Sequence, residues 1–101
     1  MAKKISLSDV ILFDWDEGNL RHIKKHAVES RECEDIFFNK TLYFEDTRHS
    51  SLEIRFLAYG ITNEKRLLTI VFTIRNNKVR VVSARDQHKK ERAIYEQGEK
   101  K

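Results

Sequence analysis

Three arginines in this sequence are placed where they could bind an anion. Arg55 and Arg80 lie within stretches of alternating apolar and polar residues, and Arg85 follows directly after the second of these stretches. A guanidinium group presents a planar fork of donors that can meet two oxygens of a phosphate or carboxylate at once. These three positions are therefore candidate anion contacts.

His49 and Glu53 are the candidates for moving a proton. Imidazole titrates nearest to neutral pH, and His49 lies in a predicted loop that also holds Asp46 and Arg48. Glu53 is the alternative base. The competing interpretation of His49 is a hydrogen bond to Asp46 that only fixes the loop.

The elements that must position these residues follow from the spacing of apolar side chains. The N-terminal half predicts a short strand at Val10–Trp15, a helix at Glu17–His26 capped by Asp16, and a second helix at Ser30–Phe38. The C-terminal half predicts strands at Leu42–Glu45, Leu52–Tyr59, Leu67–Ile74 and Val79–Ala84, then a helix from a cap at Asp86 to about Gly98. This order, β-α-α-β-β-β-β-α with antiparallel neighbours, predicts an α+β fold.

A hairpin turn at Asn76-Asn77 sets the predicted register, because Asn tolerates a positive φ. That turn places Thr73 opposite Arg80 and Phe72 opposite Val81. One face then carries Ile70, Phe72, Ile74, Val79 and Val81 as core, and the other carries Thr69, Val71, Thr73, Arg80, Val82 and Ala84. In a meander, Arg55 and Glu53 share this second face. A solvated face with surface ion pairs explains the same pattern equally well.

Length and composition predict one soluble domain, residues 1–101, with its core between about 10 and 98. Twenty basic against 16 acidic residues give a net charge of +4, which fits a nucleic-acid partner without requiring one. The single Cys33 forms no internal disulfide and lies on the apolar side of its predicted helix, so we expect a buried, inert thiol. No apolar run has membrane-spanning length, and we expect a cytoplasmic protein.

Specific residues along nearly the whole chain resemble the BrnT toxin family. The matching residues are Phe13-Asp14-Trp15-Asp16, Asn19, Lys25-His26, Val28, Phe37, Asp46, His49, Glu53-Ile54-Arg55, Gly60, Val79-Arg80-Val81-Val82-Ser83-Ala84-Arg85, Glu91-Arg92 and Tyr95-Glu96. The strand that ends in Ser-Ala-Arg, followed by Glu91 and Tyr95-Glu96, is the most distinctive part. Two positions depart from the family pattern: Ala27 replaces the usual Gly of a left-handed helix stop, and Gln87-His88 replaces Ala-Ser or Ala-Thr.

The resemblance implies a RelE-like ribonuclease toxin of a type II toxin–antitoxin system. It implies an RNA substrate, arrest of growth, and neutralisation by a BrnA-like antitoxin that also binds promoter DNA. In such an enzyme the 2′-hydroxyl attacks the adjacent phosphorus without a metal ion. Arg55, Arg80 and Arg85 would stabilise the phosphorane, and His49 or Glu53 would transfer a proton.

Further RNA contacts are expected from one helix end and from the last helix. The candidates are Lys25, His88, Lys89, Arg92 and Tyr95. Tyr95 could stack on a base or pack its ring on the sheet. Arg85 has a structural alternative as well, a salt bridge to Glu91 or Asp86.

Two other functional classes compete with the ribonuclease interpretation. The first is a non-catalytic module that binds nucleic acid or only docks the antitoxin. The second is a metal enzyme, because His22 and His26 stand four residues apart on one predicted helix, a spacing that can chelate zinc. The sequence offers no evident third ligand, so we expect neither a metal nor an organic cofactor.

Overall fold

A four-stranded antiparallel sheet forms the centre of the protein, with its strands in sequence order. The computed structural model describes residues 11–49 and 53–99. The strands are β1 (Leu42–Glu45), β2 (Arg55–Ile61), β3 (Leu67–Arg75) and β4 (Lys78–Asp86). The other elements are helices α2 (Glu17–Lys24), α3 (Ser30–Phe38) and α4 (Lys89–Glu99) and a 3-10 turn, η1 (Thr47–His49). The predicted α+β class is confirmed.

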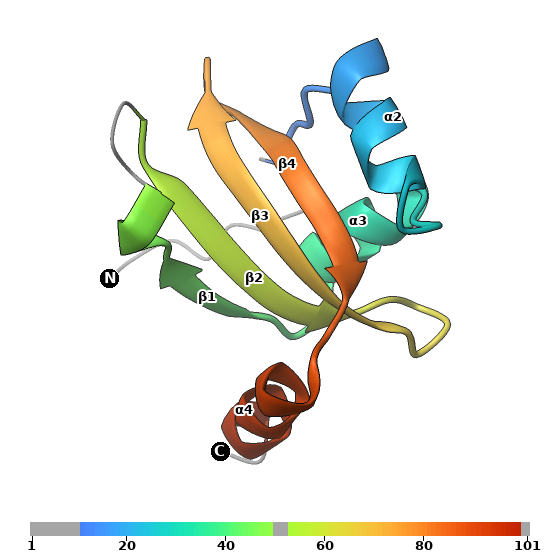
Figure 1. The fold of residues 1–101 in the computed structure, drawn as a ribbon, viewed down its shortest axis with the longest axis vertical. Coiled ribbons are helices and arrows are strands. Elements are labelled where there is room, and N and C mark those ends of the chain that lie inside the picture. The colour runs from blue at the N-terminus through green and yellow to red at the C-terminus, as the bar shows by residue number, and fades with distance from the viewer. Residues whose placement is uncertain (1–10, 50–52, 100–101) are drawn as a thin grey trace, which may run out of the picture.

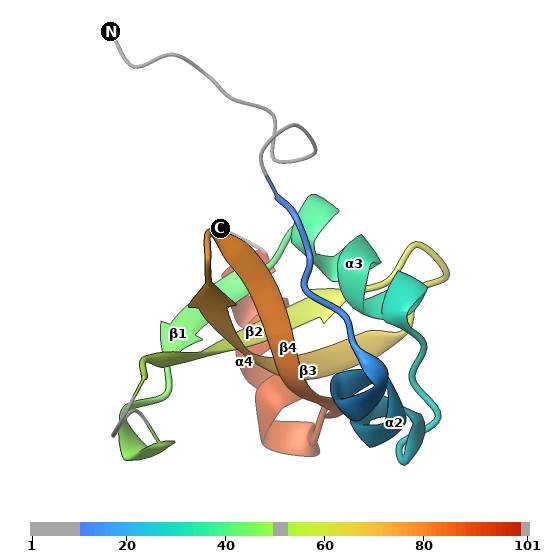
Figure 2. The same cartoon turned by 90° about the horizontal axis from the view of Figure 1, so that it is seen from above.

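The helices cover the sheet unequally. Helix α3 packs on one face, α2 stands beside β4, and α4 lies across one end of the strands (Figure 1). The view from above shows η1 and α2 flanking the sheet on the side opposite α3 (Figure 2). We call the face opposite α3 the open face, because no helix covers its middle.

The core lies between α3 and the sheet. It consists of Ile23, Val28, Cys33, Ile36, Phe37, Ala58, Leu68, Ile70, Phe72, Val79, Val81 and Ala84. Phe37 sits at its centre, with edge-to-face ring contacts to Phe72 at 5.0 Å and to Phe13 at 5.5 Å. Gly60 has no side chain where α3 crosses β2, and a Cβ there would collide with Ile36. These contacts fix the sheet against α3 and leave the opposite face free for polar side chains.

The predicted first strand is reduced to a single parallel bridge between Phe13 and Val79. Asp14 N–H donates to Val79 O, and Val79 N–H donates to Leu12 O, each at 2.8 Å. Val10, the predicted start, lies outside the described residues. The segment therefore lines the edge of β4 and delivers Asp14 beside that strand.

Helix α2 ends in a left-handed stop even though alanine occupies the critical position. Ala27 has a φ of 56°, Ala27 N–H donates to Lys24 O, and Val28 N–H donates to Ile23 O. This pair of bonds defines a Schellman motif, and Val28 and Ile23 supply its apolar contact in the core. Arg66 donates to the carbonyls of His26 and Ala27 at 3.3 and 2.9 Å. The stop is thus retained, with Ala27 in the conformation that usually favours glycine.

The β3–β4 hairpin has the predicted turn and the predicted register near it. Asn76 and Asn77 both have positive φ, and the pairs Thr73–Arg80 and Phe72–Val81 form as expected. A β-bulge then shifts the register, so that Val71 pairs with Ser83. Beyond the bulge, Ile70 pairs with Ala84 and Thr69 pairs with Arg85. The predicted face was wrong for Ala84, which is fully buried in the core. Ile74 pairs with Val79 as predicted, but its predicted burial was wrong, because it is 50% exposed.

Helix α4 begins later than predicted, because Asp86 does not cap it. Asp86 ends β4, and its carboxylate accepts from Arg66 Nε at 2.8 Å. Glu91 instead reaches back to accept from His88 N–H at 2.8 Å. None of the helices in residues 11–49 and 53–99 is long and apolar enough to cross a membrane.

Candidate active site

Three rows of side chains cross the open face, and polar and charged residues occupy the two outer rows. The sheet register aligns Arg55, Thr73 and Arg80 in one outer row and Tyr59, Thr69 and Arg85 in the other. Leu57, Val71 and Ser83 form the row between them. Neighbouring rows are two residues, or roughly 7 Å, apart along β2 and β3; along β4 the bulge makes the step from Arg80 to Ser83 three residues. The middle row therefore lies between two rows that each end in arginine.

A hollow of about 540 Å³ opens over these rows. It is lined by His22, Asp46, Arg48, Arg55, Leu57, Val71, Val82, Ser83, Arg85 and Glu91. Its floor is β2, β3 and β4, and its walls come from η1 and the residue before it, from α2, and from α4. Figures 1 and 2 show how these helices and strands are arranged. Arg48, Arg55 and Arg85 give this hollow three cationic side chains.

The bulge in β4 decides that Arg85 reaches the hollow. Residues five apart on a regular strand point to opposite faces, so Arg80 and Arg85 would be separated by the sheet. The extra residue at the bulge restores Arg85 to the face that carries Arg80. Without this bulge, the same sequence would place Ala84 on the open face and Arg85 on the face that packs on α3.

Arg85 is held in place by Glu91 of α4. Its Nη1 and Nη2 donate to the two carboxylate oxygens at 2.7 and 2.9 Å. Thr69 Oγ1 and His88 N–H also donate to this carboxylate, each at 2.8 Å. Partial burial alone would raise the pKa of Glu91, but the bonds from Arg85, His88 and Thr69 outweigh burial and lower it to about 2. The structural alternative for Arg85, a salt bridge to Glu91, is thus present.

Arg80 lies on the open face but turns toward the N-terminal segment. Its guanidinium approaches Asp16 at 2.8 Å and Asp14 at 3.5 Å, and its side chain is 19% exposed. The hydrogen bond from Asn19 N–H lowers the pKa of Asp16 below its usual value. Desolvation opposes this effect, and the hydrogen bond and charge of Arg80 add to it. Arg80 therefore ties the segment before α2 to β4, and it is not among the side chains that line the hollow.

The two candidate proton-transfer residues fall in different places. His49 ends η1, the turn that also supplies Arg48 to the hollow, while its side chain lies outside the described part of the structure. Glu53 accepts from Arg75 Nη2 at 3.3 and 3.4 Å and is not among the residues that line the hollow. Of the two predicted positions, the structure brings only the η1 turn to the hollow.

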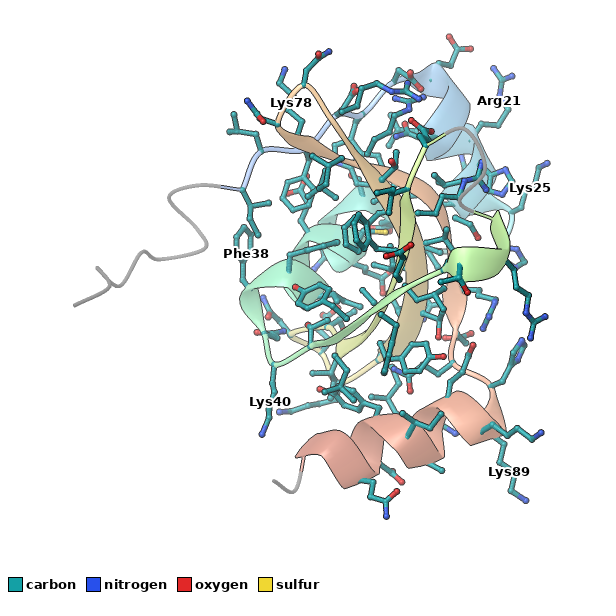
Figure 3. The ribbon with its side chains drawn as sticks, turned by 90° about the vertical axis from the view of Figure 1, so that its left-hand side faces the viewer. Arg21, Lys25, Phe38, Lys40, Lys78 and Lys89 are labelled. Atoms are coloured by element: carbon teal, nitrogen blue, oxygen red, sulfur yellow. The ribbon has the colours of Figure 1, made fainter. Side chains whose placement is uncertain are left out.

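The predicted RNA contacts divide into exposed residues and one buried residue. Lys25, His88, Lys89 and Arg92 are exposed. Lys25, Arg21 and Lys89 point to one side of the molecule, and Phe38 of α3 lies on the other (Figure 3). Tyr95 is only 1% exposed, and its hydroxyl donates to Lys40 O at 2.8 Å. Base stacking by Tyr95 is therefore the wrong interpretation, because its ring packs inside the protein.

Sequence reasoning missed His22 and Ser83 as members of the site. His22 was considered only as a zinc ligand, yet its side chain lines the hollow from α2. His22 precedes Ile23, which is 1% exposed, and therefore lies at the border of the buried face of α2. This position next to the apolar stripe is the sequence feature that could have indicated His22. Within residues 11–49 and 53–99, no three His, Cys, Asp or Glu side chains are grouped as a metal site.

Gln87, which departs from the family pattern, is buried and hydrogen-bonded to the sheet. It is 3% exposed, and its Nε2 donates to Gly60 O at 3.2 Å and to Leu68 O at 3.1 Å. Its backbone N–H donates to Leu67 O. Gln87 therefore fastens the start of α4 to β2 and β3, which also fixes the position of Glu91 and Arg85.

The fold and the site define this protein as a small α+β domain with a cationic hollow on its sheet. The chain matches the family model of BrnT, described as the ribonuclease toxin of type II toxin–antitoxin systems, over residues 15–91. No curated protein gives a significant match. The match covers more than half of the chain, and the chain belongs to the BrnT family of ribonuclease toxins.

Proposed function

We propose that this protein is an endoribonuclease that cleaves RNA in the hollow on its open face without a metal ion. The observation that carries the proposal is the joint presence of Arg55 and Arg85 in one hollow above the Ser83 row. A phosphodiester over Ser83 would lie between the two arginine rows, within reach of both guanidinium groups. Two planar forks can then share the charge that develops on the phosphorane oxygens.

The reaction we assign to the site is attack by the 2′-hydroxyl on the adjacent phosphorus. The base would be His49, at the end of the η1 wall; Glu53, which lies outside η1, is the alternative. Arg48, Arg55 and Arg85 would stabilise the added negative charge, and Arg80 would hold the N-terminal segment and face the RNA from the outer row. Lys25, His88, Lys89 and Arg92 are exposed and would contact the flanking RNA backbone.

The proposed partner is a BrnA-like, DNA-binding antitoxin that forms a hetero-oligomer with this protein in the bacterial cytoplasm. Its release would allow the nuclease to cut RNA and arrest growth. An antitoxin segment that covers the hollow would gain most by pairing the cations that otherwise bind phosphate.

A second candidate function is supported by the ion pairs of two arginines. Arg80 is bound to Asp14 and Asp16, and Arg85 is bound to Glu91 by a bidentate pair. Carboxylates in these places compete with phosphate for the same donors. A non-catalytic module that only docks the antitoxin would keep such pairs permanently closed.

End-group analysis of RNA incubated with the purified protein separates these functions. We expect fragments with a 2′,3′-cyclic phosphate and a 5′-hydroxyl, at a rate unchanged by EDTA. Loss of cleavage in EDTA, with recovery on adding a divalent ion, would contradict the metal-independent mechanism. An intact RNA under all conditions would favour the non-catalytic module.

A further inference from the structure

His22 stands on the wall of the hollow that faces η1. It projects from α2, which flanks the open face beside β4, whereas η1 flanks the same face on the side of β1 and β2 (Figures 1 and 2). Among the described side chains that line the hollow, His22 is the only imidazole. The two walls therefore offer separate groups on opposite sides of a bound phosphate.

The backbone around His22 is fixed from both ends of its helix. At the start, Asp16 and Asn19 form a capping box, with bonds of 3.0 Å from Asn19 N–H and 2.8 Å from Asp16 N–H. At the end, the Schellman bonds of Ala27 and Val28 close the helix. Ile23, the next residue, is 1% exposed in the core. The backbone of α2 therefore presents the side chain of His22 to the hollow from a defined position.

Cleavage by in-line attack needs two proton-transfer groups on opposite sides of the phosphorus. The attacking 2′-oxygen and the departing 5′-oxygen lie roughly in line, so one group cannot serve both. The base that we assign to the η1 wall takes the proton of the 2′-hydroxyl. The group that donates to the 5′-oxygen must then come from the α2 wall.

We propose that His22 is this proton donor; the inference rests on the ribonuclease function proposed above. The 2′-oxygen forms a bond to phosphorus while its proton passes to the base. The bond from phosphorus to the 5′-oxygen breaks, and the proton of the His22 imidazolium passes to that oxygen. The products are a 2′,3′-cyclic phosphate and a 5′-hydroxyl.

The other groups of the hollow are less suited to this role. Arg48, Arg55 and Arg85 carry guanidinium groups, which serve as charge partners and hydrogen-bond donors rather than as general acids. Glu91 is committed to Arg85, Thr69 and His88, and its lowered pKa leaves it without a proton to give. Ser83 has a hydroxyl with no general-acid strength near neutral pH. Asp46 lies on the η1 wall, on the side of the base and opposite the α2 wall. An imidazole is the group that can carry and release a proton there.

The test combines changes in the protein with a change of the leaving group in the RNA. Purified wild type, His22→Gln and His26→Gln are compared on a defined RNA with one scissile linkage, in its natural form and with sulfur in place of the 5′-oxygen. A thiolate departs without a proton, because a thiol has a pKa of about 8.5 and is far more acidic than an alcohol. His26 lies four residues further along the chain, in the turn after α2, and does not line the hollow, which makes it the matched control.

We expect His22→Gln to cut the natural linkage roughly 10²–10⁴ times more slowly than wild type. It should cut the sulfur linkage within a few-fold of wild type, and His26→Gln should match wild type on both. Equal rates for His22→Gln and wild type on the natural linkage would overturn the role of His22 and leave the proposed ribonuclease function standing. Equal slowing on both linkages would also overturn it, because a lost donor is rescued by sulfur. A wild-type protein that cuts neither substrate would overturn the proposed function itself.

Discussion

Glu91 of α4 binds both terminal nitrogens of Arg85 at the end of β4, at 2.7 and 2.9 Å. The same carboxylate accepts from Thr69 and from the backbone of His88, so it joins the sheet, the strand–helix junction and the hollow. Four donors to one partly buried carboxylate explain why its pKa is lowered to about 2. Glu91 therefore contributes both to the stability of the fold and to the position of Arg85 in the proposed phosphate site.

Glu91→Gln should lower the free energy of unfolding at pH 7 by on the order of 2 kcal/mol, because charge-assisted bonds to a partly buried arginine are lost. The folded-state pKa is below that of the unfolded chain, so the carboxylate stabilises the fold above pH about 4.5. That stabilisation is lost as pH falls toward 2. Urea unfolding of wild type and variant should therefore differ most at neutral pH and converge at low pH.

Glu64→Gln is the control for this comparison. Glu64 is 73% exposed and contacts Arg31 only at 3.8 Å, so its loss should change the unfolding free energy little at any pH. A difference between wild type and Glu91→Gln that stays constant from pH 7 to pH 2 would contradict the lowered pKa.

The sequence was sufficient for elements whose contacts are local. The bounds of α3 and β1 agree with those predicted, and the Asn76-Asn77 turn has the expected register, because alternation and turn chemistry act over a few residues. Arg55 could likewise be placed on the polar face of its strand.

The site depended on features that no local pattern determines. Val82 and Ser83 fit either face of a sheet, so the bulge that brings Arg85 to the hollow left no mark in the alternation. The pairing of Arg80 with Asp14 and Asp16 requires the N-terminal segment to lie beside β4, a contact across more than sixty residues of chain. The burial of Tyr95 depends on where α4 docks.

Ala27→Gly should stabilise the protein. Ala27 has a φ of 56°, a conformation that costs a residue with a Cβ roughly 1–2 kcal/mol and costs glycine little. Part of this gain is offset by the greater freedom of glycine in the unfolded chain, which leaves a net of roughly 0.5–1 kcal/mol. Thermal unfolding measures the change. Ala93→Gly, in the exposed part of α4, should have the opposite sign, and a loss of stability at both positions would argue against the left-handed stop.

Cys33 should react slowly with thiol reagents in the folded protein. Its side chain is fully buried, and burial raises the pKa of the thiol to about 12, so almost no thiolate exists at neutral pH. Reaction with a chromogenic disulfide should be fast only in denaturant. Cys33→Ser should lower the melting temperature and leave RNA cleavage unchanged well below it. Rapid labelling of the native protein would mean that α3 does not pack as described.

Antitoxin binding should protect the hollow and the start of α4 rather than the outer surface of α3. The cations of the open face are the groups an acidic antitoxin segment would pair, and such rim charges should make the complex weaken as salt rises. Hydrogen exchange of the toxin with and without the antitoxin locates the footprint. Protection confined to residues 17–38 would contradict this placement.

The most direct test of the account compares RNA cleavage by Arg55→Ala and Arg31→Ala at matched fractions of folded protein. Arg55 lines the hollow, whereas Arg31 lies on α3 with surface contacts to Glu29 and Glu64. Loss of one guanidinium from the phosphorane should slow Arg55→Ala by roughly 10²–10³, and Arg55→Lys should recover only part of the rate because a point charge makes no fork. Arg31→Ala should cut like wild type. If Arg55→Ala cuts as fast as Arg31→Ala, the hollow on the open face is not the place where RNA is cleaved.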